Sequence, residues 1–191
     1  KLKKQIPLFN DSEVGMVYGN YWIENELKGT RKIQYKKKLP SGIILNKLLK
    51  QYLVGLLTVV FRRKSFESLT YPFNPQFHII GDFDCVIRMA VNWKLDCVQD
   101  PVAHYRWHGE NVTIKHTELM ICELEKWKAE MNEHPVVSAT TNFKTEIHKK
   151  TLYLKALFRI EKRKYSDAFK LFLQFPMSKE KLKLLVAMIL K

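Results

Sequence analysis

Hydrophobic and polar positions in the first third of the chain alternate between strand-like and helix-like patterns. Residues 14–23, VGMVYGNYWI, are rich in β-branched and aromatic residues and predict a strand, which KIQYK can join as a hairpin after a turn. Apolar residues then recur at helical spacing over 44–53, with Ser41 as the predicted N-cap, and residues 56–62 predict a buried strand. The chain therefore begins as a β-rich fold with one early helix.

A second helix is predicted to begin at Asp82 and Asp84, after a loop interrupted by prolines. Apolar residues follow at i, i+3, i+4, i+7 and i+8, namely Phe83, Val86, Ile87, Ala90 and Val91. This spacing turns one apolar stripe inward and puts both carboxylates at a loop-to-helix junction. Two short strand patterns, LDCV and VAHYR, follow on either side of a turn predicted at Asp100 and Pro101.

From His116 onward the pattern is helical, so we place a boundary near residue 115. The sequence predicts an α/β part over 1–115 and a helical tail subdomain over 116–191. The last segment, KEKLKLLVAMILK, has lysines on one side and apolar residues on the other. That pattern is compatible with a helix lying on a membrane surface and equally with a helix packed on its neighbours.

The composition supports a folded core and indicates no membrane span. Of the 191 residues, 46% are hydrophobic and 12% aromatic, which excludes wholesale disorder. The longest apolar stretches fall well short of the roughly 20 residues of a spanning helix. Cys85, Cys97 and Cys122 lack a CxxC spacing, and no secretory segment stands at the start, so we expect reduced, mostly buried thiols and a cytoplasmic location.

The formal net charge of +14 admits three kinds of partner: nucleic acid, an anionic membrane surface or phosphorylated substrates. The basic residues lie in short clusters, and no RNA-recognition signature, zinc finger or P-loop is visible. Nucleic acid is therefore not the expected partner.

The two aspartates have an ordinary structural interpretation. Acidic residues at the start of a helix cap free backbone N–H groups and complement the helix dipole, and Asp84 can also pair with Arg88 one turn on. Spacing alone favours this interpretation. A functional one has to come from the surrounding sequence.

The surrounding blocks, taken in order, resemble family 2 glycosyltransferases of the GT-A fold. The order is TVVFRR, a loop with PFNPQF, then GDFDCVIRMA, WKLDCVQDPVAHYR and a W-H-G-E-N turn, and the resemblance covers residues 7–113. It implies an α/β fold, a partial GT-A-like mixed sheet with flanking helices, followed by an α-helical C-terminal tail. The matched residues correspond to the acceptor-side half of the family's domain and lack the nucleotide-binding half that precedes it.

The resemblance also implies roles for individual residues. Asp82 matches the general base, Asp84 the acid that follows it and Arg88 an arginine of the same helix, whereas Gly81 stands where the family often has glutamate. His108 matches a histidine that many relatives place near the metal and diphosphate, although a surface-turn histidine is an equal alternative.

Three further side chains are candidates for binding acceptor or donor. Arg63 and Arg106 can face anionic groups, although solvated or salt-bridged arginines are the commoner case. Trp107 can stack on a sugar face.

The implied reaction is an inverting transfer of a sugar from a nucleotide diphosphate donor to a hydroxyl of a surface glycan or lipid-linked acceptor. It implies a divalent metal, Mn²⁺ or Mg²⁺, held mainly by a D-x-D motif in the nucleotide-binding half, so we expect the isolated chain to be silent. The basic tail would suit peripheral attachment at the inner membrane face. The alternatives are a basic nucleic-acid-binding module or a helical protein-interaction module, in which Asp82 only caps a helix.

Overall fold

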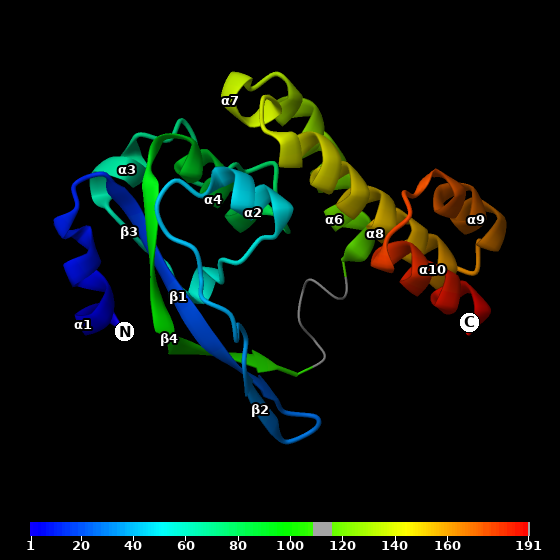
Figure 1. Ribbon diagram of the computed structural model, residues 1–191, viewed down its shortest axis with the longest axis horizontal. Coiled ribbons are helices and arrows are strands. Elements are labelled where there is room, and N and C mark those ends of the chain that lie inside the picture. Colours follow the sequence, from blue (N-terminus) through cyan, green and yellow to red (C-terminus); the bar gives the residue numbers. More distant parts are fainter. Residues whose placement is uncertain (109–115, 191) are drawn as a thin grey trace. The chain divides into compact units, whose positions relative to one another are not determined.

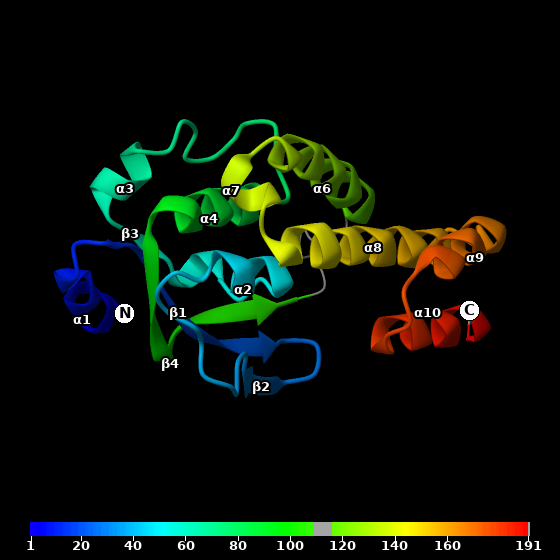
Figure 2. The ribbon, with the colours of Figure 1, turned by 45° about the horizontal axis from the view of Figure 1, so that its top comes forward.

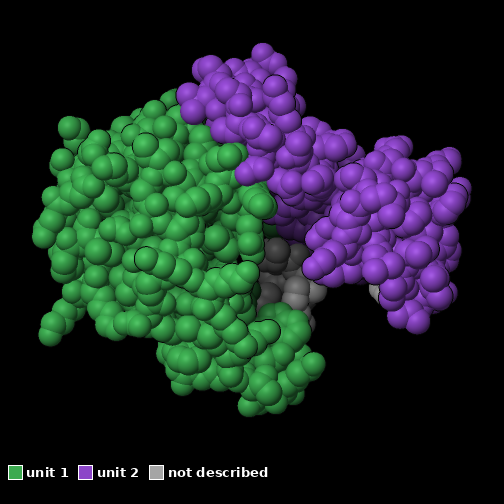
Figure 3. Space-filling view, in the orientation of Figure 1, with its two compact units in different colours: residues 1–115 green, residues 116–191 purple. Residues whose placement is uncertain are grey.

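The computed structural model describes residues 1–108 and 116–190. The chain divides into two compact units, Lys1–Lys115 and His116–Lys191, shown in green and purple in Figure 3. The first unit is mixed α/β and the second is helical. The division falls where the hydrophobic pattern changes to a continuous helical period. Within the described residues, none of the helices combines the length and the apolar character that a membrane span requires.

The first unit is a mixed sheet with short helices around it. Its elements are α1 (Leu2–Gln5), η1 (Ile6–Asn10), β1 (Val14–Asn25), β2 (Thr30–Ile33), α2 (Leu45–Lys50), η2 (Leu56–Thr58), β3 (Val60–Phe61), α3 (Arg63–Glu67), α4 (Gly81–Asn92) and β4 (Lys94–Trp107). The predicted first strand, its hairpin partner and the helix that starts at the two aspartates are confirmed as β1, β2 and α4.

Strand β1 is the centre of the sheet (Figure 1). On one edge it pairs antiparallel with β3 through Met16 and Val17, and with β2 over residues 22–25. On the other edge it pairs in parallel with β4 along its whole length. The first half of β1 is buried, and the second half is partly exposed.

The two short strands predicted around Asp100 and Pro101 are instead one continuous strand, β4. Its register against β1 slips at that point, because Val98 lies opposite Gly19 while Pro101 lies opposite Asn20. Proline cannot donate a ladder hydrogen bond, and a strand accommodates it where the pairing is irregular. The dipeptide therefore marks a bulge in β4, and Figure 1 shows the strand bending sharply along its course.

The first helix starts later than predicted. Ile44 is the N-cap residue of α2, with no side-chain capping bond, so the prediction of Ser41 as N-cap is wrong. The reason is a contact with a distant part of the chain. Gly42, at φ +90°, exchanges both backbone hydrogen bonds with Leu95 at 2.8 and 3.0 Å, so the chain is fastened to β4 before it turns into the helix.

The buried strand predicted over 56–62 is also wrong for most of its length. Residues Leu56–Thr58 form a 3-10 turn, and only Val60–Phe61 pair with β1. The Thr58 hydroxyl donates to the Gly55 carbonyl at 2.7 Å, and its own amide donates to the same carbonyl at 2.9 Å. This hydrogen-bonded turn prevents the segment from forming a strand, although its apolar and β-branched residues favour one.

Helices α2 and α4 pack against each other on one face of the sheet (Figure 2). Phe83, Val86, Ile87 and Ala90 of α4 are buried, as their spacing predicts, and Leu48 and Leu49 of α2 join them. Trp93 follows α4 directly and lies against Gly15, where an added Cβ would come within 2.6 Å of its ring. Glycine at this position lets the end of α4 approach β1 closely.

The second unit consists of helices around its own apolar core. They are α6 (Thr117–Asn132), α7 (Pro135–Ser138), the π-helical turn η3 (Phe143–Ile147), α8 (His148–Glu161), α9 (Tyr165–Gln174) and α10 (Lys179–Ile189). Trp127 of α6 is fully buried against Phe143. Helices α8, α9 and α10 share a core of Leu152, Ala156, Ile160, Ala168, Phe175 and Leu184.

Arg62 fastens the start of β1 to the turn that precedes it. Its Nε donates to the Val14 carbonyl at 2.9 Å, and its Nη2 donates to the carbonyl oxygens of Phe9 at 2.7 Å and Asp11 at 3.0 Å. The guanidinium also lies over the Phe9 ring, 5.3 Å from its centroid. The planar fork of an arginine is suited to holding several carbonyl groups at once.

We expect Arg62→Lys to destabilise the first unit, because one ammonium cannot reproduce three guanidinium hydrogen bonds. The expected loss is about 1–3 kcal/mol, visible as a lower urea midpoint in tryptophan fluorescence. Arg63→Lys is the matched control, since the Arg63 side chain is 90% exposed and its ion pair with Glu67 spans 3.9 Å. Equal midpoints for the two variants would contradict the role given to Arg62.

Candidate functional site

Asp82 lies in the first turn of α4 and is partly buried. Its Oδ1 accepts a hydrogen bond from the Phe83 amide at 2.7 Å. The Phe83 ring meets the ring of Tyr52 edge to face, with centroids 5.3 Å apart. Burial, and next the negative charge of Asp82, raises the pKa of Tyr52 well above its ordinary value. Asp82 and the Tyr52 phenol are therefore close enough to interact.

Asp84, two residues on, has a different environment. It is 1% exposed. Arg88 donates hydrogen bonds to both of its oxygens, from Nε at 3.1 Å to each and from Nη2 at 2.5 Å to Oδ2. The Arg88 side chain is itself only 15% exposed. The predicted second acid and the predicted helix arginine therefore hold each other, as the structural interpretation of this spacing predicts.

Asp82 and Asp84 also have the spacing of a D-x-D metal motif. Because both lie on one helix, however, they cannot bind the same metal ion. Side chains two residues apart on a helix point to different sides, and Arg88 occupies Asp84. Nowhere in residues 1–108 and 116–190 do three or more His, Cys, Asp or Glu side chains gather as a metal-binding group would require. Asp82 and Asp84 thus do not form a shared metal site.

Four tyrosines from distant parts of the chain interact with one another, and we call them the tyrosine cluster: Tyr21, Tyr35, Tyr52 and Tyr105. The ring of Tyr21 lies 6.0 Å from that of Tyr35 and 6.3 Å from that of Tyr105. Tyr35 and Tyr21 also contribute to the raised pKa of Tyr52, although less than Asp82 does. β1, β4, the loop after β2 and the end of α2 each supply one member.

Asn20 positions one member of this cluster. Its side chain is 3% exposed, its Nδ2 donates to the Tyr35 carbonyl at 2.7 Å, and its Oδ1 accepts from the Tyr35 amide at 3.1 Å. This two-bond clamp fixes the loop backbone against β1. The Tyr35 ring is thereby held beside Tyr21.

The phenol groups of Tyr21 and Tyr52 stay protonated at neutral pH. Burial, followed by the charges of neighbouring phenols, raises the pKa of Tyr21 far above its ordinary value, as burial and Asp82 do for Tyr52. The Tyr52 hydroxyl oxygen is buried and has no hydrogen-bond partner in the described part of the chain. A buried hydroxyl without a partner costs about 1–3 kcal/mol. The described contacts of Tyr52 do not offset this cost.

Successive side chains of β4 point to opposite faces of the sheet, so the other predicted residues are divided between the two faces. Parallel partners point to the same face, so Tyr105 and Trp107 share the face of Tyr21, which contacts Tyr105. His104 and Arg106 point to the opposite face. His104 Nδ1 lies 2.7 Å from Glu24 Oε1 there. The His104 side chain is 51% exposed.

Arg106 and Arg63 lie apart from Asp82. Arg106 is 75% exposed and lies 4.0 Å from Glu26. Arg63 starts α3, next to Arg62, whose amide bonds to Gly15 beneath Trp93. Trp93 and Asp82 are at opposite ends of α4, about 16 Å apart at 1.5 Å rise per residue. Trp107 is thus the predicted binding residue that the fold leaves on the face of the tyrosine cluster.

His108, the tentative metal ligand, is exposed and directly follows β4. The remainder of the W-H-G-E-N turn lies outside the described residues.

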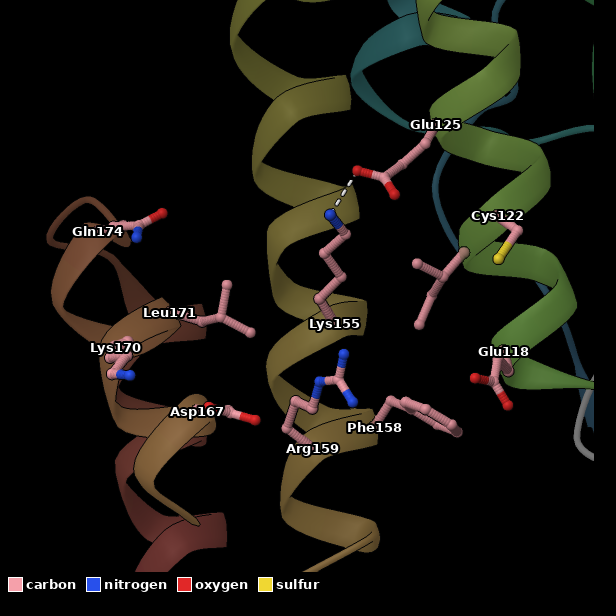
Figure 4. Close-up of a pocket in the computed structure, with 11 residues that line it drawn as sticks. Glu118, Cys122, Glu125, Lys155, Phe158, Arg159, Asp167, Lys170, Leu171 and Gln174 are labelled. Carbon is pink, nitrogen blue, oxygen red and sulfur yellow. Dashed lines mark hydrogen bonds and ion pairs between the residues drawn. The ribbon is translucent and has the colours of Figure 1, made fainter. Parts of the chain in front are cut away.

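The second unit contains a separate pocket of about 530 Å³. Figure 4 shows Lys155, Phe158 and Arg159 of α8 between residues of α6 and α9, with Lys155 paired to Glu125. Its lining carries both signs of charge: Glu118, Glu125 and Asp167 against Lys155, Arg159 and Lys170. Because the two signs balance, the lining selects neither an anion nor a cation.

Comparisons with known proteins found no match to this chain among protein-family models, curated proteins or solved structures.

We expect Asp84→Asn to destabilise the protein by about 3–5 kcal/mol, because it leaves Arg88 as a buried charge without its partner. Asp82→Asn is the matched comparison, since Asp82 is less buried and complements the helix dipole for no more than about 1 kcal/mol. Thermal unfolding followed by near-ultraviolet circular dichroism measures both. Comparable losses for the two variants would show that Asp82 is also held as a structural group.

Thiol chemistry tests the burial of the site. Burial, opposed by Arg88 and reinforced by Asp84 and Asp82, raises the pKa of Cys85 to about 12, and burial raises that of Cys97 to about 11. Both thiols are free and buried, as predicted, whereas Cys122 is exposed. At pH 8 a thiol reagent should label Cys122 rapidly and the others only in denaturant.

The same shifts fix a pH dependence with a definite sign. Because the folded protein favours the neutral thiols, their contribution to stability is complete below the ordinary cysteine pKa of 9.0 and is lost as the pH rises toward about 12.

In the labelling experiment, Cys122→Ser should abolish the rapid labelling. Rapid labelling of a second thiol in the native protein contradicts the assigned burial.

Proposed function

We propose that the first unit is the acceptor-side part of an inverting, nucleotide-sugar-dependent glycosyltransferase of the family 2, GT-A type, with Asp82 as the general base. Two things support the proposal. The order of sequence blocks resembles that family over residues 7–113. The observation that carries it is the position of Asp82 beside the buried, unpartnered hydroxyl of Tyr52.

The proposed chemistry needs one carboxylate at the acceptor. The acceptor oxygen attacks the anomeric carbon from the face opposite the nucleoside diphosphate. A C–O bond forms, the bond from the anomeric carbon to the diphosphate oxygen breaks, and the hydroxyl proton passes to Asp82. The diphosphate leaves with the electron pair. Asp82 has this role and Asp84 does not, because Arg88 already occupies both oxygens of Asp84.

The neighbouring side chains suit a sugar acceptor. The Tyr52 hydroxyl, protonated at neutral pH, donates to a sugar oxygen, and this contact satisfies its buried O–H. Trp107, on the same face as Tyr105 and Tyr21, offers a ring for stacking on the C–H face of a sugar. The Asp84–Arg88 pair fixes the first turns of α4 and so holds Asp82 in place.

The donor side of the proposal lies outside the described residues. The nucleotide diphosphate and the divalent metal, Mn²⁺ or Mg²⁺, are assigned to a D-x-D-bearing half. The acceptor is proposed to be a surface glycan or a lipid-linked glycan, which places the reaction in polysaccharide biosynthesis at the cell envelope.

A glycan array probed with the 191-residue chain tests acceptor binding. We expect retention of a subset of glycans, and a loss of about tenfold or more for Tyr52→Phe, because one hydrogen bond of about 1.4 kcal/mol corresponds to that factor. Trp107→Ala should weaken the same glycans. Asp100→Asn is the control, since its carboxylate is exposed and paired with Lys4.

A turnover assay distinguishes the proposed role of Asp82 as the base from the proposed location of the donor site. With a panel of nucleotide sugars, Mn²⁺ and the retained glycans, the chain alone is expected to release no diphosphate above background. Transfer that Asp82→Asn abolishes would support the base and overturn the claim that a donor half is missing. Absence of both glycan retention and turnover, with salt-dependent binding to DNA or RNA instead, would replace the proposal by the nucleic-acid alternative.

A further inference from the structure

Helix α10 is held in a fixed orientation in the second unit. Leu184 is fully buried in the shared core, with Ala187 and Met188 packed beside it. The Ser178 side chain caps the helix by accepting from the Lys181 amide at 3.3 Å, and Lys181 Nζ donates to the Phe175 carbonyl at 2.6 Å. One face of α10 is therefore committed to the core.

The opposite face is apolar and exposed. Residues two positions from Leu184 and Ala187 point away from the core, because the helix turns by more than half a revolution in two residues. Leu182, Val186 and Ile189 occupy this face, and Ile189 is 73% exposed. The exposed stripe also includes Leu185 and Leu190, with Met177 just before the helix.

Lysines border this stripe. Lys179 and Lys183, one turn apart, are exposed along one side of it, and Lys181 lies along the other, over the Phe172 ring at 4.9 Å. An apolar face rimmed by lysines is the pattern of helices that lie in the interface of a membrane.

We propose that α10 docks the protein on an anionic lipid surface, with Leu182, Val186 and Ile189 in the acyl boundary and Lys179 and Lys183 at the headgroups. Charge decides between this surface and a second copy of the chain. Pairing two copies through the stripe brings like-charged lysine borders together, whereas anionic headgroups neutralise them. This inference concerns the second unit and does not depend on the proposed glycosyl transfer.

Vesicle co-sedimentation of the whole chain tests the proposal. One set of vesicles is phosphatidylcholine alone, and the other contains equal parts of phosphatidylcholine and phosphatidylserine. We expect binding to the mixed vesicles at least about tenfold stronger than to the neutral ones, from roughly 1 kcal/mol for each lysine near the surface.

Three variants assign the contact to α10. Leu182→Glu with Ile189→Glu removes the apolar part and should abolish binding to both kinds of vesicle. Lys179→Glu with Lys183→Glu should remove the preference for phosphatidylserine. Leu27→Glu is the control, because Leu27 is an apolar side chain of the first unit with 70% exposure, and it should leave binding unchanged.

Circular dichroism checks that each variant keeps its helices, which the exposure of the changed side chains leads us to expect. Equal binding to neutral and mixed vesicles, or no binding to either, overturns the proposal. So does a dimer in light scattering that Leu182→Glu with Ile189→Glu dissociates, since that result assigns the stripe to a second copy.

Discussion

The parallel pairing of β1 with β4 is the constraint on which the first unit depends. Parallel strands cannot be joined by a tight hairpin, so the chain between them must cross over and return. Helices α2 and α4 belong to that crossover and pack on one face of the sheet. Because α4 runs directly into β4, its first turn lies toward the carboxyl ends of both strands. In open α/β sheets this is the end at which ligands bind. The location of Asp82 is thus a consequence of strand pairing.

The sequence pattern correctly predicted those elements in which intrinsic secondary-structure propensity and burial in the fold favour the same structure. The strand over 14–23, its hairpin partner and the helix at Asp82 were predicted, because burial and propensity there favour the same structure. Ser41 failed as a cap because Gly42 pairs with Leu95, a residue far along the chain. The strand predicted over 56–62 failed because Thr58 closes a local turn. The break at Pro101 became a bulge because β1 supplies a partner on both sides of it. The failures at Ser41 and Pro101 result from contacts between residues far apart in the chain, whereas Thr58 closes a turn within its own segment.

The candidate site was predicted only in part, for the same reason. The spacing of Asp84 and Arg88 predicts their pairing, since both lie on one helix. The tyrosine cluster depends on the register of β1 against β4, and that register includes slips that no periodicity reveals. Its members are scattered over residues 21–105, so the sequence offered no signal for it beyond the alternation of each strand. The same alternation places Trp107 and Arg106 on opposite faces although they are neighbours in sequence.

The two aspartates of α4 illustrate how burial distributes roles between identical side chains. A carboxylate that is 1% exposed must have a charged partner, and Arg88 fixes Asp84 in one geometry that leaves it no further ligand. Asp82 is less buried and acts electrostatically on the phenol of Tyr52, whose hydroxyl is unsatisfied within the described residues. A phenylalanine at position 52 would keep the ring contact with Phe83 and avoid burying an unpaired hydroxyl. The protein carries that cost beside Asp82, where a sugar hydroxyl bound to the carboxylate would also meet the phenol. The proposed acceptor site thus accounts for a buried polar group that the fold by itself does not explain.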